Sequence, residues 1–297
     1  MRIARTLFFR SWEGLGVRSP RSGFPDSFLP PLASCLSSMS NVFLVAGPSG
    51  VGKTHWIAEH LQQHPPNQTI AYLNLGGGSF PLDARSLETL HPKLDCLSDE
   101  NASVKLVEHQ GAANPIYIEV GFHIALDSLV LPLVDCRNIV LVPPNGPETD
   151  WHHWTEADEV IVGVGTAPES IINLQMQRAL LSGEVFDPPS LDIFWQELIQ
   201  GAYGSVERAK AILNIADGQT FLFNFISGLE GSDYRALEVP LCLDGRPQGF
   251  SGLEVVGEGL DGAGITETLQ DCFVNDEMLA QYQAYLKTAQ ETRVDMN

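Results

Sequence analysis

The stretch best suited to chemistry is residues 47–54, which read GPSGVGKT. This sequence matches GxxxxGK(S/T), a phosphate-binding loop whose glycines let backbone N–H groups approach phosphate oxygens closely. The lysine of such a loop reaches the β and γ phosphates, and the hydroxyl that follows it holds Mg²⁺. The sequence therefore predicts binding of GTP or ATP together with Mg²⁺. The expected cofactor-binding residues are Gly47, Ser49, Gly50, Val51, Gly52, Lys53 and Thr54.

The segments on either side of this loop give it the structural context that a phosphate loop needs. Residues 42–46 (VFLVA) are a short apolar run, which suits a strand buried on both faces of a parallel sheet. Residues 54–61 then read as a helix. The N-terminus of that helix carries a partial positive charge, which favours the binding of phosphate. Strand, loop and helix in this order make the prediction more specific than the loop sequence alone.

An acidic residue, Glu119, ends another apolar run at residues 115–119 (PIYIE). An acid at the carboxyl end of a buried strand fits the Walker B position, where a carboxylate holds Mg²⁺ or positions water. We therefore expect Lys53 and Glu119 to be catalytic, and Thr54 and Glu119 to be the Mg²⁺ ligands. The alternative is that Glu119 is a solvated carboxylate at a strand end.

The elements around these residues predict the fold class. Residues 69–75, 138–142 and 159–163 read as further buried strands, and helical patterns lie between several strands, including one at residues 170–181. Alternating strands and helices are typical of a parallel sheet covered on both faces. We predict an α/β fold, a P-loop NTPase-type and mostly parallel sheet with helices on both faces. Ligands bind such sheets at the carboxyl ends of the strands.

The C-terminal part of the chain has a different order of elements. A linker is predicted at residues 187–189 (DPP), and an amphipathic helix at 191–203. Strand-like stretches and then helices follow, which indicates a smaller α+β domain. The strands are expected at residues 205–215, 219–226 and 252–256, and the helices at 264–273 and 276–288. The predicted domains are 39–185 for the phosphate loop and 186–297 for the α+β part.

Residues 1–38 differ in composition from the remainder. They hold five arginines but only two acidic residues, Glu13 and Asp26, and they are rich in Pro and Ser. Met39 directly precedes the first predicted strand, so a chain that starts there would lack nothing the fold needs. We expect residues 1–38 to be a disordered or non-native extension without a role in folding. An organelle transit peptide is the alternative.

The bulk properties exclude several classes of protein. The chain of 297 residues has a formal net charge of −20, which argues against nucleic acid as a partner because phosphate backbones attract clustered Lys and Arg. No apolar stretch reaches the roughly 18 residues that span a bilayer, so no membrane partner is expected. The five cysteines are scattered without a CxxC pair, which is typical of reduced thiols in a cytoplasmic protein.

The order of these segments resembles the CobW-like P-loop GTPases, a family associated with metal handling. The similar segments follow the family's order: LNLGG at 73–77 with Asp83, IEVG at 118–121, ADEVIV at 157–162, GSVERAKAIL at 204–213, and LEVVG at 253–257. The resemblance covers about residues 40–275. It implies a nucleotide-binding domain followed by a CobW-type C-terminal domain, slow Mg²⁺-dependent hydrolysis of NTP, and a metalloprotein client.

The sequence departs from the family at the residues that carry its metal and base chemistry. The metal-binding CxCC is absent, and Leu75 and Phe122 replace an acid and a glycine of the family's patterns. The guanine-reading NKxD is replaced by Gly-Val-Gly at 163–165. The resemblance therefore leaves phosphate binding supported, whereas guanine selectivity and metal delivery are not.

Some cysteines and histidines are candidate metal ligands. Cys96 is flanked by His91 and His109, which leaves a weak mixed-ligand site open, but a closed zinc site needs about four ligands. His152 and His153 are adjacent, and neighbouring residues on a strand point in opposite directions. We expect no tight thiolate metal site, and an aromatic loop around the two adjacent histidines.

Two further functions remain open from the sequence. A small-molecule kinase would need an arginine-rich lid, yet only Arg85, Arg137 and Arg178 lie between the loop and residue 187. A non-catalytic nucleotide-binding regulator fits the missing motifs better. Arg208 and Lys210 lie at alternate positions and so on one face of their predicted strand. One interpretation is a basic spot that senses nucleotide or partner. The alternative is a solvated face or a local ion pair.

Overall fold

The computed structural model describes residues 41–125, 135–145, 148, 150–154, 156–166 and 173–294. Both sheets described below belong to one compact unit, Ser40–Asn297. The predictions made for residues 1–38 lie outside the described residues.

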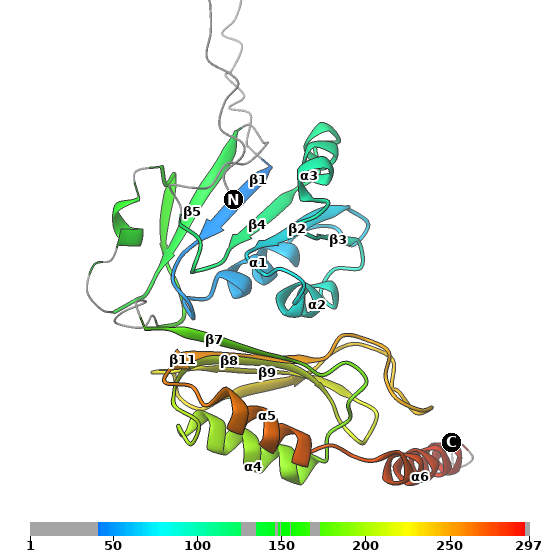
Figure 1. Cartoon of the computed structure of the whole chain (residues 1–297). Helices are drawn as coiled ribbons and strands as arrows, with labels where there is room; N and C mark the ends of the chain where they lie inside the picture. Colours follow the sequence, from blue (N-terminus) through cyan, green and yellow to red (C-terminus); the bar gives the residue numbers. More distant parts are fainter. Residues whose placement is uncertain are drawn as a thin grey trace, which may run out of the picture. The chain divides into compact units, whose positions relative to one another are not determined.

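The first sheet consists of parallel strands in the order β3-β2-β4-β1-β5-β6 (Figure 1). Its described pairings are all parallel, and each therefore needs a crossover connection. The strands are β1 (Val42–Ala46), β2 (Ile70–Leu75), β3 (Leu94–Leu97), β4 (Ile116–Val120), β5 (Cys136–Val142) and β6 (Glu159–Val162). The predicted parallel α/β sheet is confirmed.

Helices cover both faces of this sheet because its strands are apolar on both sides. The helices are α1 (Lys53–Leu61), α2 (Leu82–Glu88) and α3 (Ala102–Gly111). Leu44 and Ala46 of β1 belong to the apolar cluster that includes Leu106 of α3. Val45 between them belongs to the opposite cluster, which includes Ile57 of α1. The alternation along β1 thus fixes which helix lies on which face.

The second sheet is antiparallel, in the order β10-β9-β8-β11-β7. Its strands are β7 (Gln175–Leu180), β8 (Ser205–Asn214), β9 (Thr220–Ile226), β10 (Asp233–Ala236) and β11 (Gly252–Glu258). Helices α4 (Pro188–Ile199) and α5 (Gly262–Asp271) lie against one face of it (Figure 1). Their buried residues, among them Phe194 and Leu269, pack on Ala211 and Val255. This arrangement agrees with the predicted α+β part.

The predicted helix at residues 170–181 is wrong over its described part, because residues 175–180 form β7. β7 pairs with β11 at six positions, from Gly252↔Leu180 to Gly257↔Gln175. The local pattern was compatible with a helix, but pairing with a strand more than 70 residues later in the chain decides the conformation. β7 belongs to the second sheet although it precedes residue 185, the predicted end of the first domain. The domain boundary at 185/186 itself stays a prediction.

The predicted linker at residues 187–189 is the start of α4. The Asp187 side chain accepts a hydrogen bond from the backbone N–H of Ser190, and Pro188 occupies the first helical turn. Aspartate is a favoured N-cap, and proline fits the first turn because the N–H that it lacks would have no partner there. The proline pair therefore begins the helix that was predicted to start at Leu191.

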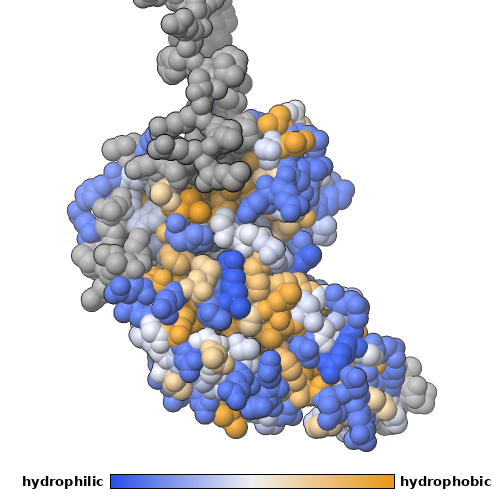
Figure 2. All heavy atoms as spheres, viewed as in Figure 1, coloured by the Kyte–Doolittle hydropathy of each residue, from blue (hydrophilic) through white to orange (hydrophobic). Residues whose placement is uncertain are grey.

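The last helix, α6 (Asp276–Val294), follows α5 after a short connection. In the space-filling view of Figure 2, hydrophilic residues predominate over the part of the surface where α6 lies. Among the described residues, no helix is long and apolar enough to cross a membrane.

Candidate functional site: a phosphate loop beside a cavity lined by both sheets

The loop at residues 47–54 connects the centre of the first sheet to α1, as the sequence predicts. Gly47 has a φ of 146°, and a Cβ atom there would lie 2.4 Å from the carbonyl oxygen of Leu141. Gly52 is the N-cap of α1 with a φ of 103°, in the left-handed region. Both glycines are therefore required by the backbone, and the loop ends at the N-terminus of a nine-residue helix.

The Lys53 side chain folds back over the loop. Its ammonium group donates hydrogen bonds to the carbonyl oxygens of Gly47 and Pro48, both at 2.9 Å. Burial of this group lowers the pKa of Lys53 to about 8, and the nearby Glu119 carboxylate opposes that shift. A buried cation held by weak carbonyl partners is suited to receive an anion.

Thr54 and Glu119, the two residues predicted to hold Mg²⁺, lie next to each other. The Thr54 hydroxyl donates to Oε1 of Glu119 at 2.9 Å, and the Tyr72 hydroxyl donates to Oε2 at 2.9 Å. Burial raises the pKa of Glu119, and the neighbouring Asp83 carboxylate raises it further. Glu119 is 6% exposed, so the alternative of a solvated carboxylate at a strand end does not hold.

A second carboxylate, Asp83 in the first turn of α2, lies beside this pair. Its Oδ1 is 2.5 Å from the ammonium nitrogen of Lys210 and 3.5 Å from the Thr54 hydroxyl. The Asn74 side chain donates to its other oxygen at 3.1 Å. Although burial opposes it, the positive charge of Lys210 lowers the pKa of Asp83, so this carboxylate is held ionised.

Two buried polar atoms at the site lack a hydrogen-bond partner among the described residues. They are the hydroxyl of Ser49, which is 4% exposed, and Nε of Arg208. A buried polar group without a partner is costly, by about 1–3 kcal/mol. Because both residues line the same cavity, these atoms indicate that a polar ligand belongs there.

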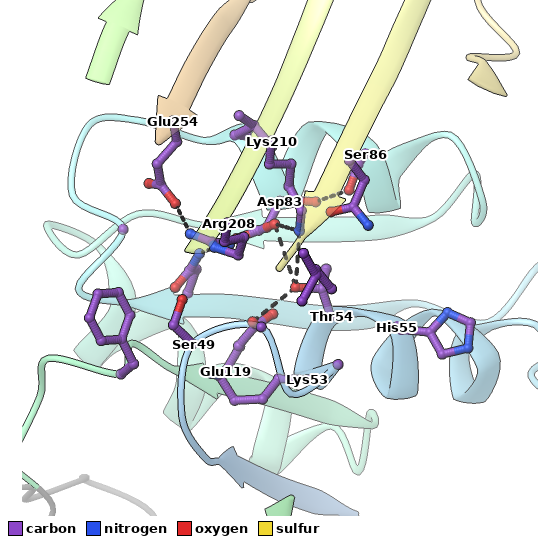
Figure 3. A pocket seen from close by; sticks show the side chains of 18 of the residues that line it. Ser49, Lys53, Thr54, His55, Asp83, Ser86, Glu119, Arg208, Lys210 and Glu254 are labelled. Atoms are coloured by element: carbon purple, nitrogen blue, oxygen red, sulfur yellow. Dashed lines mark hydrogen bonds and ion pairs between the residues drawn. The ribbon is translucent and has the colours of Figure 1, made fainter. Parts of the chain in front are cut away.

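The cavity has a volume of about 290 Å³ and is lined by residues of both sheets. The first sheet and its helices contribute Ser49, Lys53, Thr54, Asp83 and Glu119, and the second sheet contributes Arg208, Lys210 and Glu254 (Figure 3). Most of these side chains are charged, and dashed lines in Figure 3 connect Thr54 to Glu119, Asp83 and Lys210. The charges of both signs in its lining therefore suit a charged ligand that binds together with a cation.

Two arginines on the second sheet are held by a carboxylate of the same sheet. Arg178 on β7 donates from Nε to Glu254 at 2.7 Å and from Nη1 to the carbonyl oxygen of Gly77 at 2.9 Å. Arg208 on β8 also forms an ion pair with Glu254. Of the two interpretations given to Arg208 and Lys210, local ion pairs are confirmed, and both residues face the cavity rather than bulk solvent.

The segment at residues 163–165, where NKxD would stand, lies against the phosphate loop. A Cβ atom on Gly163 would be 2.2 Å from the carbonyl oxygen of Val51, and one on Gly165 would be 1.8 Å from that of Gly50. The backbone N–H of Gly165 donates to Val51 at 3.3 Å. Only glycine permits this approach, so the segment supports the phosphate loop.

The residues considered as metal ligands have other partners. His91 donates from Nε2 to the carbonyl of Pro65 at 3.1 Å, and His109 contacts Asp95 at 2.9 Å. Burial raises the pKa of the Cys96 thiol, which disfavours the thiolate that a metal needs. Exposed His153 pairs with Glu148 at 3.2 Å. Within the described residues, no group of three or more His, Cys, Asp or Glu is arranged to hold a metal.

The donors around Thr54 nevertheless fit Mg²⁺ in chemical type. Mg²⁺ takes hard oxygen ligands and is usually held by one or two carboxylates together with substrate phosphates. A threonine hydroxyl and the carboxylates of Glu119 and Asp83 are such donors, and they lie at the end of the phosphate loop. A magnesium ion would neutralise phosphate charge there.

Two of the residues that complete the site were not among the predicted ligands. In the sequence, Asp83 stands out only through the family pattern that includes residues 73–77. Lys210 stands out only through the basic spot that it forms with Arg208. The signal for Lys210 was its spacing from Arg208 by two residues, which places both on one face of a strand. Nothing in the local sequence shows that this face meets α2.

Comparison with known proteins adds a weak structural likeness. No sequence-family model matches the chain, and no curated protein matches it in sequence. A crystal structure of Zn(II)-bound YjiA GTPase from E. coli aligns with 78% of this chain and 98% of its own, at 14% identity and a TM-score of 0.27. A Zn(II)-bound triple mutant of YjiA GTPase aligns with the same values. Likeness at this level does not establish family or function.

Proposed function

We propose that this protein binds a nucleoside triphosphate, GTP or ATP, with Mg²⁺ in the cavity beside residues 47–54. The observation that carries the proposal is the unpartnered Ser49 hydroxyl, buried in a loop where Lys53 is also buried. The first turn of α1 offers free backbone N–H groups at the same point. Together these groups suit an anion such as a phosphate.

Each residue has a role that its contacts support. Lys53 releases the carbonyls of Gly47 and Pro48 and turns its ammonium to the β and γ phosphates. The Thr54 hydroxyl and Glu119, already 2.9 Å apart, hold Mg²⁺. Glu119 is also the acid placed to position an attacking water, since it lies at the carboxyl end of β4.

Any hydrolysis by this site is expected to be slow. Transfer of a phosphoryl group to water is accelerated when a free cation stabilises the charge of the transition state. Arg235 on the edge strand β10 lines the cavity, and so do Arg178 and Arg208, but these last two are bound to Glu254. A partner that pulled Glu254 away would free them, so stimulated turnover is consistent with the geometry.

A non-catalytic nucleotide-binding regulator is the second candidate, and the ion pairs of Arg178 and Arg208 with Glu254 favour it.

A small-molecule kinase is less favoured. Two of the three arginines that could form its lid, Arg137 and Arg85, pair with Glu159 and Glu88 at the surface. A metalloprotein client and a cytoplasmic location follow from the family resemblance and composition, and they stay predictions.

Calorimetry with GTP and ATP, with and without Mg²⁺, tests the proposal on the full chain. Lys53→Ala is expected to weaken binding at least hundredfold, about 2.8 kcal/mol, because the phosphate loses its buried cation. Lys105→Ala is the matched control, since Lys105 is exposed and forms an ion pair with Glu108.

Thr54→Ala separates the metal from the phosphate contacts. It is expected to weaken binding in Mg²⁺ and to leave binding in EDTA unchanged. Equal affinity of Lys53→Ala and the unmodified protein for both nucleotides would overturn the proposal, provided that thermal unfolding shows the variant to be folded.

A further inference from the structure

Lys210 brings a positive charge from the second sheet to the point where Mg²⁺ is expected. It lies on β8, opposite Glu254 of β11 and Asn224 of β9. Its ammonium nitrogen is 2.5 Å from Oδ1 of Asp83 and 3.4 Å from the Thr54 hydroxyl. The Lys210 side chain is 12% exposed, so this contact is shielded from solvent.

The partners of Lys210 are the same oxygen atoms that suit a magnesium ion. The Thr54 hydroxyl has one hydrogen, which it donates to Glu119 at 2.9 Å, and it therefore accepts from Lys210. Asp83 is bound on its other side by Asn74 at 3.1 Å. The ammonium group thus completes a cluster of oxygen atoms and is the ion-pair partner of the buried Asp83 carboxylate.

A divalent cation and an ammonium group cannot share these oxygens. Both positive charges would lie within a few ångströms of each other at a site with little solvent screening. Mg²⁺ brings two charges and enters with the phosphates of a nucleotide, whereas Lys210 is tethered and always present. The two cations therefore compete, and the phosphates decide the outcome.

We propose that Lys210 is an internal substitute for Mg²⁺, which holds Asp83 and Thr54 until a metal–nucleotide complex displaces it. Lys210 then makes metal binding depend on nucleotide, because it prevents the empty site from binding a divalent cation without nucleotide. This inference rests on the proposed function, because it assigns the metal position of the same site. The exchange also couples β8 of the second sheet to the binding of metal and nucleotide, since metal binding breaks the Asp83–Lys210 ion pair.

Binding of Mn²⁺ to the nucleotide-free full chain, followed by electron paramagnetic resonance, tests the inference. The unmodified protein is expected to bind Mn²⁺ weakly. Lys210→Met removes the competing charge and is expected to bind Mn²⁺ at least tenfold more tightly. Lys210→Arg keeps the charge and should resemble the unmodified protein, as should Lys105→Met, which alters an exposed lysine.

A second variant guards against an effect on folding. Lys210→Met combined with Asp83→Asn removes the carboxylate as well, and Mn²⁺ binding is expected to fall back to the level of the unmodified protein. Lys210→Gln serves if Lys210→Met does not fold. Unchanged Mn²⁺ affinity in whichever of these two single variants is used, once it is shown to be folded, overturns the inference.

Nucleotide binding on the same samples distinguishes the two proposals. If the unmodified protein binds neither GTP nor ATP, the proposed function fails whatever the Mn²⁺ result. If nucleotide binds while Lys210→Met gains no Mn²⁺ affinity, the assignment of Lys210 alone fails.

Discussion

The two ends of the proposed nucleotide site are built in different ways. At the phosphate end, charged side chains have defined partners, as Lys53, Glu119 and Asp83 do. At the other end, residues 163–165, which the family resemblance aligns with the base-reading motif, offer only backbone and the exposed side chain of Val164. The first end can recognise charge, whereas the second offers no carboxylate within these three residues to pair with guanine.

This difference separates two tasks in the site: charged side chains recognise the phosphates, whereas residues 163–165 support the backbone of the phosphate loop. Gly163 and Gly165 lie so close to the phosphate loop that any side chain would meet its carbonyl oxygens. The segment therefore serves the phosphate end by shape. A change there should alter phosphate binding without altering the choice of base, and that expectation can be tested directly.

Among the tests of this comparison, the largest effect is expected from Gly165→Ala. A Cβ atom would lie 1.8 Å from the carbonyl oxygen of Gly50, so the phosphate loop must shift. We expect triphosphate affinity to fall tenfold or more, although residue 165 contacts no phosphate in the proposal, and stability to fall by about 1–3 kcal/mol. Calorimetry and thermal unfolding measure the two effects.

Gly249→Ala is the matched control, because a Cβ atom on Gly249 meets no atom within 4 Å among the described residues. Equal loss of affinity for ATP and GTP in Gly165→Ala would support a role in shape alone. Unchanged affinity for both would show that the two ends of the site are independent.

An intermediate effect is expected from pH. The pKa of Lys53 is lowered to about 8 by burial, so its positive charge is lost as pH rises through that value. Between pH 7 and pH 9 the protonated fraction falls about tenfold, and affinity for triphosphate should fall by about the same factor. Lys53→Met should bind weakly with a flat profile, and a flat profile in the unmodified protein would contradict the prediction.

Stability of the nucleotide-free protein should change in the opposite direction. The folded-state pKa of Lys53 lies below its unfolded value of 10.5, so the unfolded chain binds more protons between about pH 8 and 10.5. Lys53 therefore costs stability below pH 8, and the cost is relieved as pH rises through this window. Thermal unfolding of the protein and of Lys53→Met, compared across this range, isolates the contribution.

The smallest effect is expected from the identity of the base. Because no carboxylate stands at residues 163–165, ATP and GTP affinities should lie within roughly tenfold, about 1.4 kcal/mol. Competition between the two nucleotides for one labelled analogue measures the ratio. A preference for GTP above about a hundredfold would mean that another segment reads guanine and would end the contrast between the two ends.

The sequence predicted the phosphate end because its parts are contiguous or lie at strand ends. The glycines and Lys53 sit in one loop, and Glu119 is marked by its place after an apolar run. Parallel strands buried on both faces give continuous apolar runs, so β1, β2 and β4 were also recognised.

The parts that depend on contacts distant in sequence were not predicted. β7 was taken for a helix because its partner β11 lies more than 70 residues later in the chain. The meeting of Lys210 with Asp83 joins residues 127 positions apart and depends on how the second sheet is placed. The start of α4 was missed for a different reason, since Asp-Pro-Pro serves both as a linker and as an N-cap with proline in the first turn.

The central place of β1 has a consequence for the order of folding. Val42 pairs with Ile116 of β4 on one side and with Cys136 of β5 on the other, and β1 has no pairing with β2. During synthesis the glycine loop leaves the ribosome long before the strands that hold it. Closing such long segments costs entropy before any contact repays it. Nucleotide would therefore bind only a chain in which β5 is already in place, and it would stabilise late intermediates rather than nascent ones.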